Sequence, residues 1–356
     1  MARGDRDLSS NEPNGPLTIR DLAKLANTST ATISRVLSGK PGVSEAKRLG
    51  ILELVERLGY SPNRIAQNLA LQKSHLLGFI AADLRNLQYI TVFRHVQQSV
   101  EPTGYQMLIA DSGLSVDKER LNIGVMRQHR AEGLIIFPLH DWDEESGLDH
   151  LVELKLARFP FVVVGRIEGY GFDSVTSEEF ETARALARHL LEHGHRRIGF
   201  VGAEDRNRCI RERLAGVRRA VEEEGLGLQP GHIVPHEEGW PGVMMEMLRQ
   251  EDRPTALVMM NDVCALTAWQ LMLDAGLSLP ADLSIVSFGD NIWSSQLRPR
   301  LTTTVEDTAE VARVAVDLLM SRTEGSGTAP GVRLVPQSIV YRDSVAPPPR
   351  MVRPAR

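Results

Sequence analysis

The sequence predicts a small all-α module at the N-terminus followed by a larger α/β body of two lobes. Residues 17–58 contain three short amphipathic helical patterns separated by turn signals. From residue 76 onward, short apolar runs alternate with longer amphipathic stretches, which is typical of parallel strands covered by helices on both faces. The chain has 356 residues, enough for two or three domains, and the length of the α/β pattern favours two lobes over one.

The first predicted helix begins at Thr18, whose hydroxyl can cap it, with Asp21 at the fourth position of a capping box. Asn27 ends this helix, because asparagine tolerates the left-handed backbone that a tight turn needs. Helical spacing predicts one buried face, made of Ile19, Leu22, Ala23, Leu25 and Ala26.

A second helix follows at once, capped by Ser29. Its buried positions are predicted to be Ile33, Val36 and Leu37. Its exposed side carries Thr30, Ala31, Thr32, Ser34 and Arg35. Small, hydroxyl-bearing residues with one arginine let a helix lie close to base edges and hydrogen-bond to them. The pair of helices therefore predicts a helix-turn-helix whose partner is double-stranded DNA.

The third helix is predicted from a Ser44 cap to Gly59. Its expected apolar stripe is Leu49, Ile51, Leu52, Val55 and Leu58. Residues 17–73 hold nine Lys and Arg against four acids, a net charge of +5, so the rest of the chain carries −10. A basic module on an acidic body suits a protein that presents one end to DNA phosphates, although a merely uneven surface has the same charge.

Seven apolar runs of the body predict buried strands, at 76–82, 106–110, 133–137, 159–165, 197–202, 255–260 and 283–288. Helices are expected between them, at 88–101, 116–130, 178–193, 210–224, 262–275 and 307–321. Polar loop residues at the carboxyl ends of such strands are where parallel sheets bind ligands.

Composition and motifs exclude several classes of protein. The two cysteines, Cys209 and Cys264, indicate a reduced compartment without disulfides. No apolar run reaches transmembrane length and the first residues are polar, so we expect a cytoplasmic, nucleoid-associated protein with no membrane partner. Sequence motifs of catalysis, of nucleotide binding and of metal binding are lacking, so no enzyme activity, cofactor or metal is expected. His193 and His195 are expected to belong to a helix-to-strand turn rather than to a metal site.

Residues 17–74 resemble the N-terminal module of the lactose/galactose repressor (LacI) family. The motifs that carry this resemblance are TIRDLAKLA, STATISRVLSG, GVSEAKR, LGYSPNRIAQNLA and the join to LLGFI. The resemblance implies that Thr30, Ala31 and Arg35 contact major-groove bases, with a phosphate contact as the alternative for Arg35. It also implies a DNA-binding hinge helix after Pro62, with these minor-groove residues: Asn63, Arg64, Ala66 and Leu69. Leu69 would wedge into a base step and bend the duplex, unless it is an ordinary linker leucine.

The remainder resembles the family's effector domain, which has the periplasmic-binding-protein fold with a ligand cleft between two lobes. The motifs are GHRRIGFVG, RERLAGVRRA, the stretch from MMNDVCAL to SIVSFGD, and LTTTVED. Candidate effector-binding residues are Asp83, Tyr89, Arg166, Arg213, Trp240, Asn261 and Asp290, with Asn86 and Asp262 in the same loops. Arg213, Asn261 and Asp290 would hydrogen-bond a polar ligand, and Tyr89 or Trp240 would stack on a sugar ring. The alternatives are that Arg213 braces the cleft and that Asn261 caps a helix.

Two departures from the family bear on the ligand. Gly289 stands where the family commonly places an acid before Asp290, so one hydroxyl acceptor is missing. The chain also carries a basic cluster near the cleft, made of Arg206, Arg208, Arg211 and Arg213. This cluster suggests either an acidic ligand, such as a sugar acid or a phosphorylated sugar, or a solvated charged helix face.

Together these features predict a sequence-specific transcriptional regulator, a repressor, that binds a palindromic operator as a homodimer under the control of a sugar or sugar derivative. A sugar-binding protein of transport type and a regulator controlled by a protein partner are the alternatives. The sign of the ligand's effect, induction or corepression, stays open. The predicted organisation is a disordered tail (1–16), a lambda-repressor-like helix-turn-helix domain (17–61), a hinge (62–74), a two-lobe effector domain (75–345) and a disordered tail (346–356).

Overall fold

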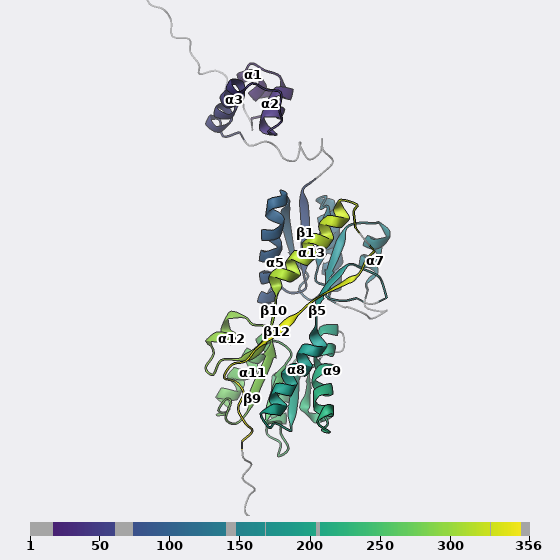
Figure 1. Cartoon of the computed structure of the whole chain (residues 1–356), viewed down its shortest axis with the longest axis vertical. Coiled ribbons are helices and arrows are strands. Elements are labelled where there is room, and N and C mark those ends of the chain that lie inside the picture. Colours follow the sequence, from purple (N-terminus) through teal and green to yellow (C-terminus); the bar gives the residue numbers. More distant parts are fainter. Residues whose placement is uncertain are drawn as a thin grey trace, which may run out of the picture. The chain divides into compact units, whose positions relative to one another are not determined.

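The structure, a computed structural model, describes residues 17–60, 74–139, 147–167, 169–203, 207–327 and 329–349. The chain divides into two compact units, Met1–Ser74 and His75–Arg356, which are called here the helical unit and the α/β unit (Figure 1). Each is described by itself. The predicted fold class, a helical N-terminal module and a two-lobe α/β body, is confirmed.

The helical unit contains α1 (Ile19–Leu25), α2 (Thr30–Leu37) and α3 (Glu45–Arg57). Leu22 and Ile33 are fully buried at its centre. Three leucines expected in the core are instead exposed: Leu25 by 59 %, Leu49 by 54 % and Leu52 by 41 %. None of them belongs to the buried stripe of its helix, which in α3 follows residues 51, 54, 55 and 58 at the i, i+3, i+4, i+7 spacing and leaves Leu49 on the opposite side.

The first lobe of the α/β unit (the N-lobe) is built on a six-stranded sheet in the order β11-β5-β4-β3-β1-β2, with every pair parallel. Its strands are β1 (Leu76–Ala81), β2 (Gln106–Asp111), β3 (Gly133–Ile136), β4 (Phe161–Val164), β5 (Ser174–Ser177) and β11 (Val332–Val335). The helices are α5 (Leu87–Val100), α6 (Val116–Gln128), α7 (Asp149–Leu156) and α13 (Thr308–Thr323), with the short η1 (Glu101–Thr103) after α5. Residues of α5 and α13 form the core on one sheet face, and residues of α6 and α7 form it on the other.

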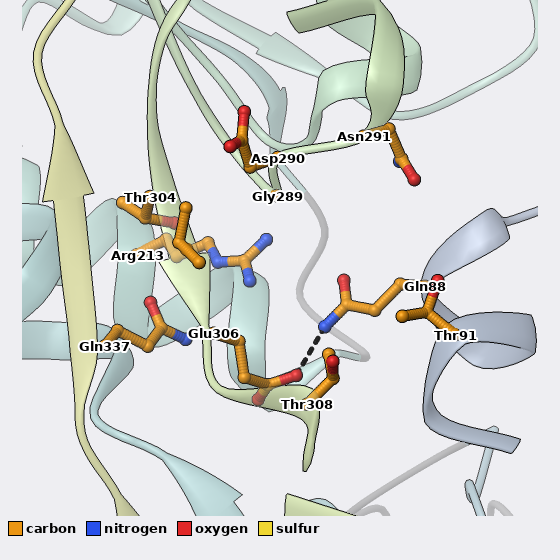
Figure 2. A pocket seen from close by; sticks show the side chains of 11 residues that line it. Gln88, Thr91, Arg213, Gly289, Asp290, Asn291, Thr304, Glu306, Thr308 and Gln337 are labelled. Atoms are coloured by element: carbon orange, nitrogen blue, oxygen red, sulfur yellow. Dashed lines mark hydrogen bonds between the residues drawn. The ribbon is translucent and has the colours of Figure 1, made fainter. Parts of the chain in front are cut away.

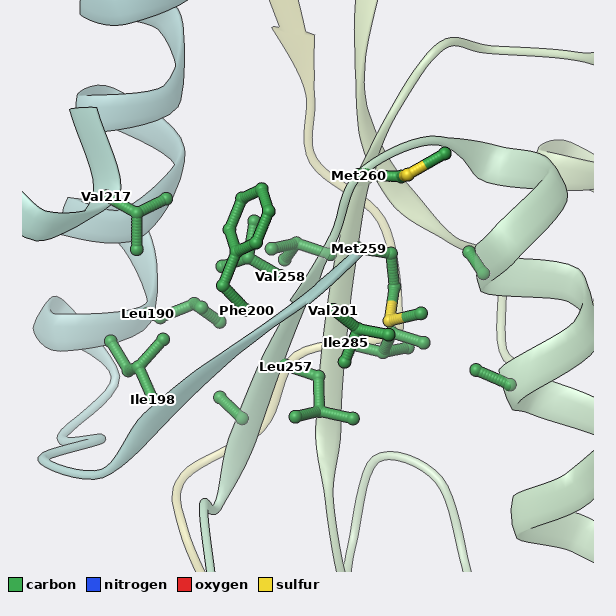
Figure 3. Packing of buried hydrophobic residues seen from close by; sticks show 14 of the residues in the cluster. Leu190, Ile198, Phe200, Val201, Val217, Leu257, Val258, Met259, Met260 and Ile285 are labelled. Atoms are coloured by element: carbon green, nitrogen blue, oxygen red, sulfur yellow. The ribbon is translucent and has the colours of Figure 1, made fainter. Parts of the chain in front are cut away.

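The second lobe (the C-lobe) has a sheet in the order β12-β10-β9-β8-β6-β7. Its strands are β6 (Ile198–Ala203), β7 (Ile233–Pro235), β8 (Ala256–Met259), β9 (Ser284–Phe288), β10 (Thr302–Glu306) and β12 (Gln337–Val340). The helices are α8 (Glu179–Glu192), α9 (Arg208–Glu223), α10 (Trp240–Met247), α11 (Asp262–Asp274) and α12 (Ile292–Gln296), with η2 (Pro230–His232) before β7. Phe200 and Val258 lie in the core between this sheet and its helices (Figure 3).

The chain crosses between the two lobes three times, after β5, after β10 and after β11 (Figure 1). Glu179, Glu306 and Gln337 stand at or next to these crossings, so side chains distant in sequence meet at the ends of the strands. All seven predicted strands are confirmed. Among the described residues, no helix is long and apolar enough to cross a membrane.

Candidate functional site

Side-chain caps hold the first two helices of the helical unit. Thr18 and Asp21 form both bonds of a capping box: Thr18 Oγ1 accepts the Asp21 N–H (3.4 Å) and Asp21 Oδ2 accepts the Thr18 N–H (3.0 Å). The Thr18 hydroxyl lowers the pKa of Asp21. Asn27 takes the left-handed backbone with φ of +46°, and Ser29 Oγ accepts the Thr32 N–H at 3.1 Å. The predicted helix starts and turn are confirmed.

The outer side of α2 is small and polar, as a recognition helix requires. Thr30, Ala31, Ser34 and Arg35 are exposed, and Thr32 is half-buried. Arg48 of α3 has a different role, because its guanidinium donates to Lys40 O at 2.7 Å and braces the turn after α2. The predicted hinge residues Asn63, Arg64, Ala66 and Leu69 lie outside the described residues.

The α/β unit contains a cavity of about 190 Å³ where its two lobes meet (Figure 2). Gln88 and Thr91 come from α5 of the N-lobe, and the other lining residues come from the C-lobe and the crossings. The complete lining is Gln88, Thr91, Arg213, Gly289, Asp290, Asn291, Thr304, Val305, Glu306, Thr308 and Gln337. Hydroxyl, amide and carboxylate groups dominate it, which suits a ligand with many hydroxyls.

Arg213 is held on one side of this cavity and is only 8 % exposed. Its Nε donates to Glu179 Oε2 at 2.7 Å and its Nη1 to Met260 O at 2.6 Å. Its guanidinium lies 4.3 Å from the ring centroid of Phe288. Burial opposes its charge, but Cys209 and the Glu179 carboxylate hold the pKa of Arg213 above its usual range. Arg213 is thus a fixed cation whose charge is already offset by Glu179, so it braces the cleft as well as lining it.

Glu306, the last residue of β10, presents a carboxylate to the cavity. Gln88 Nε2 donates to its Oε2 at 2.7 Å (Figure 2), and the Ser177 hydroxyl donates to its Oε1. Burial raises the pKa of Glu306, an effect that the Ser177 hydrogen bond opposes. Both carboxylate oxygens are therefore oriented, and each keeps a lone pair for a further donor.

The loop after β9 shows why glycine occupies position 289. Gly289 has a φ of +85°, and a Cβ there would lie 3.5 Å from the carboxylate of Asp262. Asp262 is buried, accepts the Asn291 N–H at 2.8 Å and has a pKa raised by burial. The side chain of an acid at position 289 would thus start next to the Asp262 carboxylate, where a second negative charge is unfavourable. Asp290, the remaining acid, is bound at both oxygens by Arg342 at 2.6 and 2.7 Å.

Of the seven predicted effector residues, Arg213 and Asp290 line the cavity, while the other five are not among the lining residues. Asp83 accepts from the Arg85 guanidinium at 2.9 Å, and Tyr89 packs edge-on against Phe137. Asn261 Oδ1 accepts the Cys264 N–H at 2.8 Å and caps α11, as its alternative predicted. Arg166 lies just after β4 and Trp240 begins α10, both half-buried.

The basic cluster near the cavity is largely paired. Arg208 forms an ion pair with Glu212 at 2.7 Å, and Arg213 with Glu179. Arg211 also has an interaction partner, and Arg206 lies outside the described residues.

Among all the described residues, no group of three or more His, Cys, Asp and Glu side chains is placed to hold a metal ion.

Most of the lining was missed from the sequence. The largest omission is the edge formed by β10 and the start of α13, which supplies Thr304, Val305, Glu306 and Thr308. The motif LTTTVED covers three of these residues, but its threonines do not form an apolar run and no strand was assigned there. No sequence motif around Gln88 or Gln337 indicated that either residue would line a cavity.

Comparison with known proteins identifies both units. The profile described as "Bacterial regulatory proteins, lacI family" matches residues 18–63, and that of a "Periplasmic binding protein-like domain" matches residues 187–345. Catabolite control protein A of Priestia megaterium is 31 % identical over 333 residues, which cover 92 % of this chain and 99 % of the relative. The HTH-type transcriptional regulator GalR of Escherichia coli K12 is 29 % identical over 335 residues, covering 93 % and 96 % of the two chains.

A solved structure of similar fold is the lac repressor dimer bound to operator and the anti-inducer ONPF. The TM-score is 0.82 at 24 % identity, and the match covers 93 % of this chain and all of that one. At this identity the likeness concerns the fold. From the sequence relatives and the helix-turn-helix, the chain belongs to the lacI family of bacterial regulatory proteins and is a DNA-binding transcriptional regulator.

Proposed function

We propose that this regulator represses transcription by binding a palindromic operator as a homodimer, with α2 of each subunit in the major groove. The observation that carries the proposal is the exposed, small and polar outer face of α2, held between the Ser29 cap and the buried Ile33. Thr30, Ala31 and Arg35 are assigned to base edges. Thr18, Ser29, Thr32 and Ser34 are assigned to the surrounding DNA contacts, because hydroxyls and helix N-termini commonly bind phosphates.

Selection of bound sequences from a palindromic random library, followed by fluorescence anisotropy on the selected operator, tests this function. Arg35→Ala should weaken discrimination at one operator position by about 1–3 kcal/mol if Arg35 reads a base edge. An equal loss on every sequence would make Arg35 a phosphate contact. Failure to bind any duplex at low salt would instead favour the sugar-binding protein of transport type.

We assign residues 17–61 to the DNA-binding domain, 62–74 to the hinge and 75–345 to the effector domain, with tails at 1–16 and 346–356. Association with the nucleoid would follow from DNA binding. Asn63, Arg64 and Ala66 are proposed to follow the minor groove, and Leu69 to open a base step. Leu69→Ala should then weaken operator binding more than non-specific binding, since the wedge acts only in the bent complex. Equal losses on both kinds of DNA would contradict this role.

The homodimer is proposed to form through apolar residues that the single α/β unit leaves exposed. On the N-lobe they lie on the edge strand β2 and around α6, and include Ile109 and Leu121. On the C-lobe Val263, Leu266 and Leu273 share one side of α11. Apolar surface of this kind is typical of subunit interfaces. Leu121→Asp should shift the mass measured by analytical ultracentrifugation toward the monomer, whereas Gln98→Glu, which adds the same charge at an exposed position of α5, serves as the charge control.

The proposed effector is a neutral polyhydroxy compound, such as a sugar, bound in the interlobe cavity. Arg213 is neutralised by Glu179, Asp290 by Arg342, and Glu306 adds a further carboxylate. The described lining residues therefore offer acceptors to hydroxyl groups and no unpaired cation to an acid. The remaining predicted effector residues are assigned to the loops and helix starts around the cleft rather than to the cavity wall: Asp83, Tyr89, Arg166, Trp240 and Asn261.

Thermal shift with matched pairs of sugars tests the effector class, for example glucose with gluconate and galactose with galacturonate. Stabilisation by the neutral member only is expected, because ligand that binds the native state alone raises the Tm. Preference for the acidic member would overturn the assignment, and no response to a broad panel would favour control by a protein partner. Operator affinity measured with and without the stabilising sugar gives the sign of the coupling.

A further inference from the structure

The hydrogen bond from Gln88 to Glu306 joins the two lobes across the cavity (Figure 2). Gln88 belongs to the first turn of α5, and its own N–H is accepted by the side chain of Asn86 at 3.0 Å. The same helix is anchored in the N-lobe by Val92 and Val96, both fully buried. The amide of Gln88 therefore extends from a rigid part of the N-lobe.

Glu306 is the last residue of a C-lobe strand and precedes the crossing into α13. In the antiparallel pair of β10 and β12, it stands opposite Gln337, which begins the strand after another crossing. Its second oxygen accepts the hydroxyl of Ser177, at the crossing after β5. One carboxylate thus contacts or faces all three segments that connect the lobes.

A second set of bonds links these segments to Arg213. Gln337 Nε2 donates to Glu179 Oε1 at 2.9 Å, and Glu179 Oε2 accepts Arg213 Nε at 2.7 Å. Within this network Gln88 is the partner supplied by α5, an N-lobe helix that also contributes Thr91 to the cavity wall. Separation of the lobes at this point removes the Gln88 bond while the bonds among the crossings can persist.

We propose that Gln88 is a positioning residue, which fastens the Glu306 carboxylate to α5 of the N-lobe and, together with the Ser177 bond at the crossing after β5, sets the relative position of the lobes at the cavity. The proposal rests on the assignment of the cavity as the effector site. A ligand whose hydroxyl binds Glu306 does so beside this bond, and therefore acts where the lobes are fastened. Loss of the bond should loosen the crossings without unfolding either lobe core.

Swapping the amide at position 88 and the carboxylate at position 306 tests the contact in the full-length protein, without ligand or DNA. Gln88→Glu places a second carboxylate against Glu306. Glu306→Gln in the same chain removes that repulsion, because the new amide at position 306 can donate to the carboxylate introduced at position 88 while its carbonyl still accepts from Ser177. Gln98→Glu is the matched control, an exposed position on the same helix. Hydrogen–deuterium exchange and thermal unfolding are measured for the wild type, both single variants, the double variant and the control.

Gln88→Glu should speed amide exchange in the first turn of α5 and in residues 302–308, leave exchange in the β6 and β8 core unchanged, and lower the Tm of the α/β unit by about 2–4 °C. The double variant should return both measurements toward wild type, and Gln98→Glu should change neither. Three results would each overturn the proposal. They are equal amide exchange in Gln88→Glu and the control, faster amide exchange throughout the lobe cores, and a double variant whose amide exchange and Tm stay at the values of Gln88→Glu. None of these outcomes bears on DNA binding, which the operator selection tests separately.

Discussion

Acid should weaken the C-lobe through His195, a histidine that the fold keeps neutral. Its side chain is 1 % exposed. Nε2 lies 2.8 Å from Ala346 O, which can only accept, so Nε2 carries the proton. Nδ1 lies 2.9 Å from the hydroxyl of Thr255 and accepts from it. Burial lowers the pKa of His195 from 6.5 to about 4.

Unfolding returns the ring to water, so between pH 6.5 and about pH 4 the unfolded chain binds a proton that the native chain does not. The contribution of neutral His195 is complete above the unfolded pKa and is lost as the pH falls toward the native pKa. With pKa values of 6.5 and about 4, a change from pH 7.5 to pH 5 should cost about 2 kcal/mol of unfolding free energy. Below pH 4 this loss should level off.

Urea unfolding at pH 7.5 and pH 5, followed by tryptophan emission, measures the effect, since three of the four tryptophans belong to the C-lobe. His195→Gln keeps an amide donor for Ala346 O but removes the titrating ring, and His129→Gln changes an exposed histidine as the control. The wild type and the control should lose about 2 kcal/mol more than His195→Gln between the two pH values. An identical loss in all three proteins would refute the assignment of the acid effect to His195.

Three further substitutions test the packing and the caps. Thr18→Ala should cost the helical unit about 1 kcal/mol, and Ser44→Ala, at a cap without a side-chain hydrogen bond, should cost less; a circular-dichroism melt that ranks them in the opposite order would contradict the capping geometry. Ile33→Ala should cost about 2–5 kcal/mol and abolish gel-shift binding to DNA while the α/β unit melts as before, so retained binding would count against its central place in the core. Gly216→Ala puts a Cβ 2.3 Å from Phe180 O and should lower the Tm of the C-lobe by several degrees; an unchanged calorimetric Tm would show that α8 and α9 separate at no cost.

The DNA-binding module could be predicted closely because its signals are local. The caps at Thr18 and Ser29 join residues three apart, and Asn27 forms the turn through its own backbone preference. Leu25 and Leu49 were wrongly predicted to be buried. Several apolar residues fit a loose helical spacing, and the spacing alone does not show which of them lie a quarter turn or more away from the buried stripe.

The α/β architecture was also readable, since buried parallel strands are continuous apolar runs. Five strands of the described chain escaped prediction, and all of them are short: β5, β7, β10, β11 and β12. Of these, β5 reads SVTS and β10 reads TTTVE, yet both pair on two sides within their sheets. Their threonines and serines are buried by neighbours that only the folded sheet supplies. The cavity wall beside β10 was therefore missed together with the strand.

The amino-acid sequence by itself determined the DNA partner, the family and the alternation of apolar strands with helices, because these follow from patterns that repeat within a few residues. Tertiary structure alone decided the cavity. Gln88 and Glu306 are 218 positions apart and Asp290 and Arg342 are 52 apart, and both pairs form only when the chain has crossed between its lobes. The role of a polar side chain depends on the partner that the fold places beside it. Asn261 caps α11, Arg213 forms an ion pair with Glu179, and Glu306 accepts a hydrogen bond from Gln88 at the cavity.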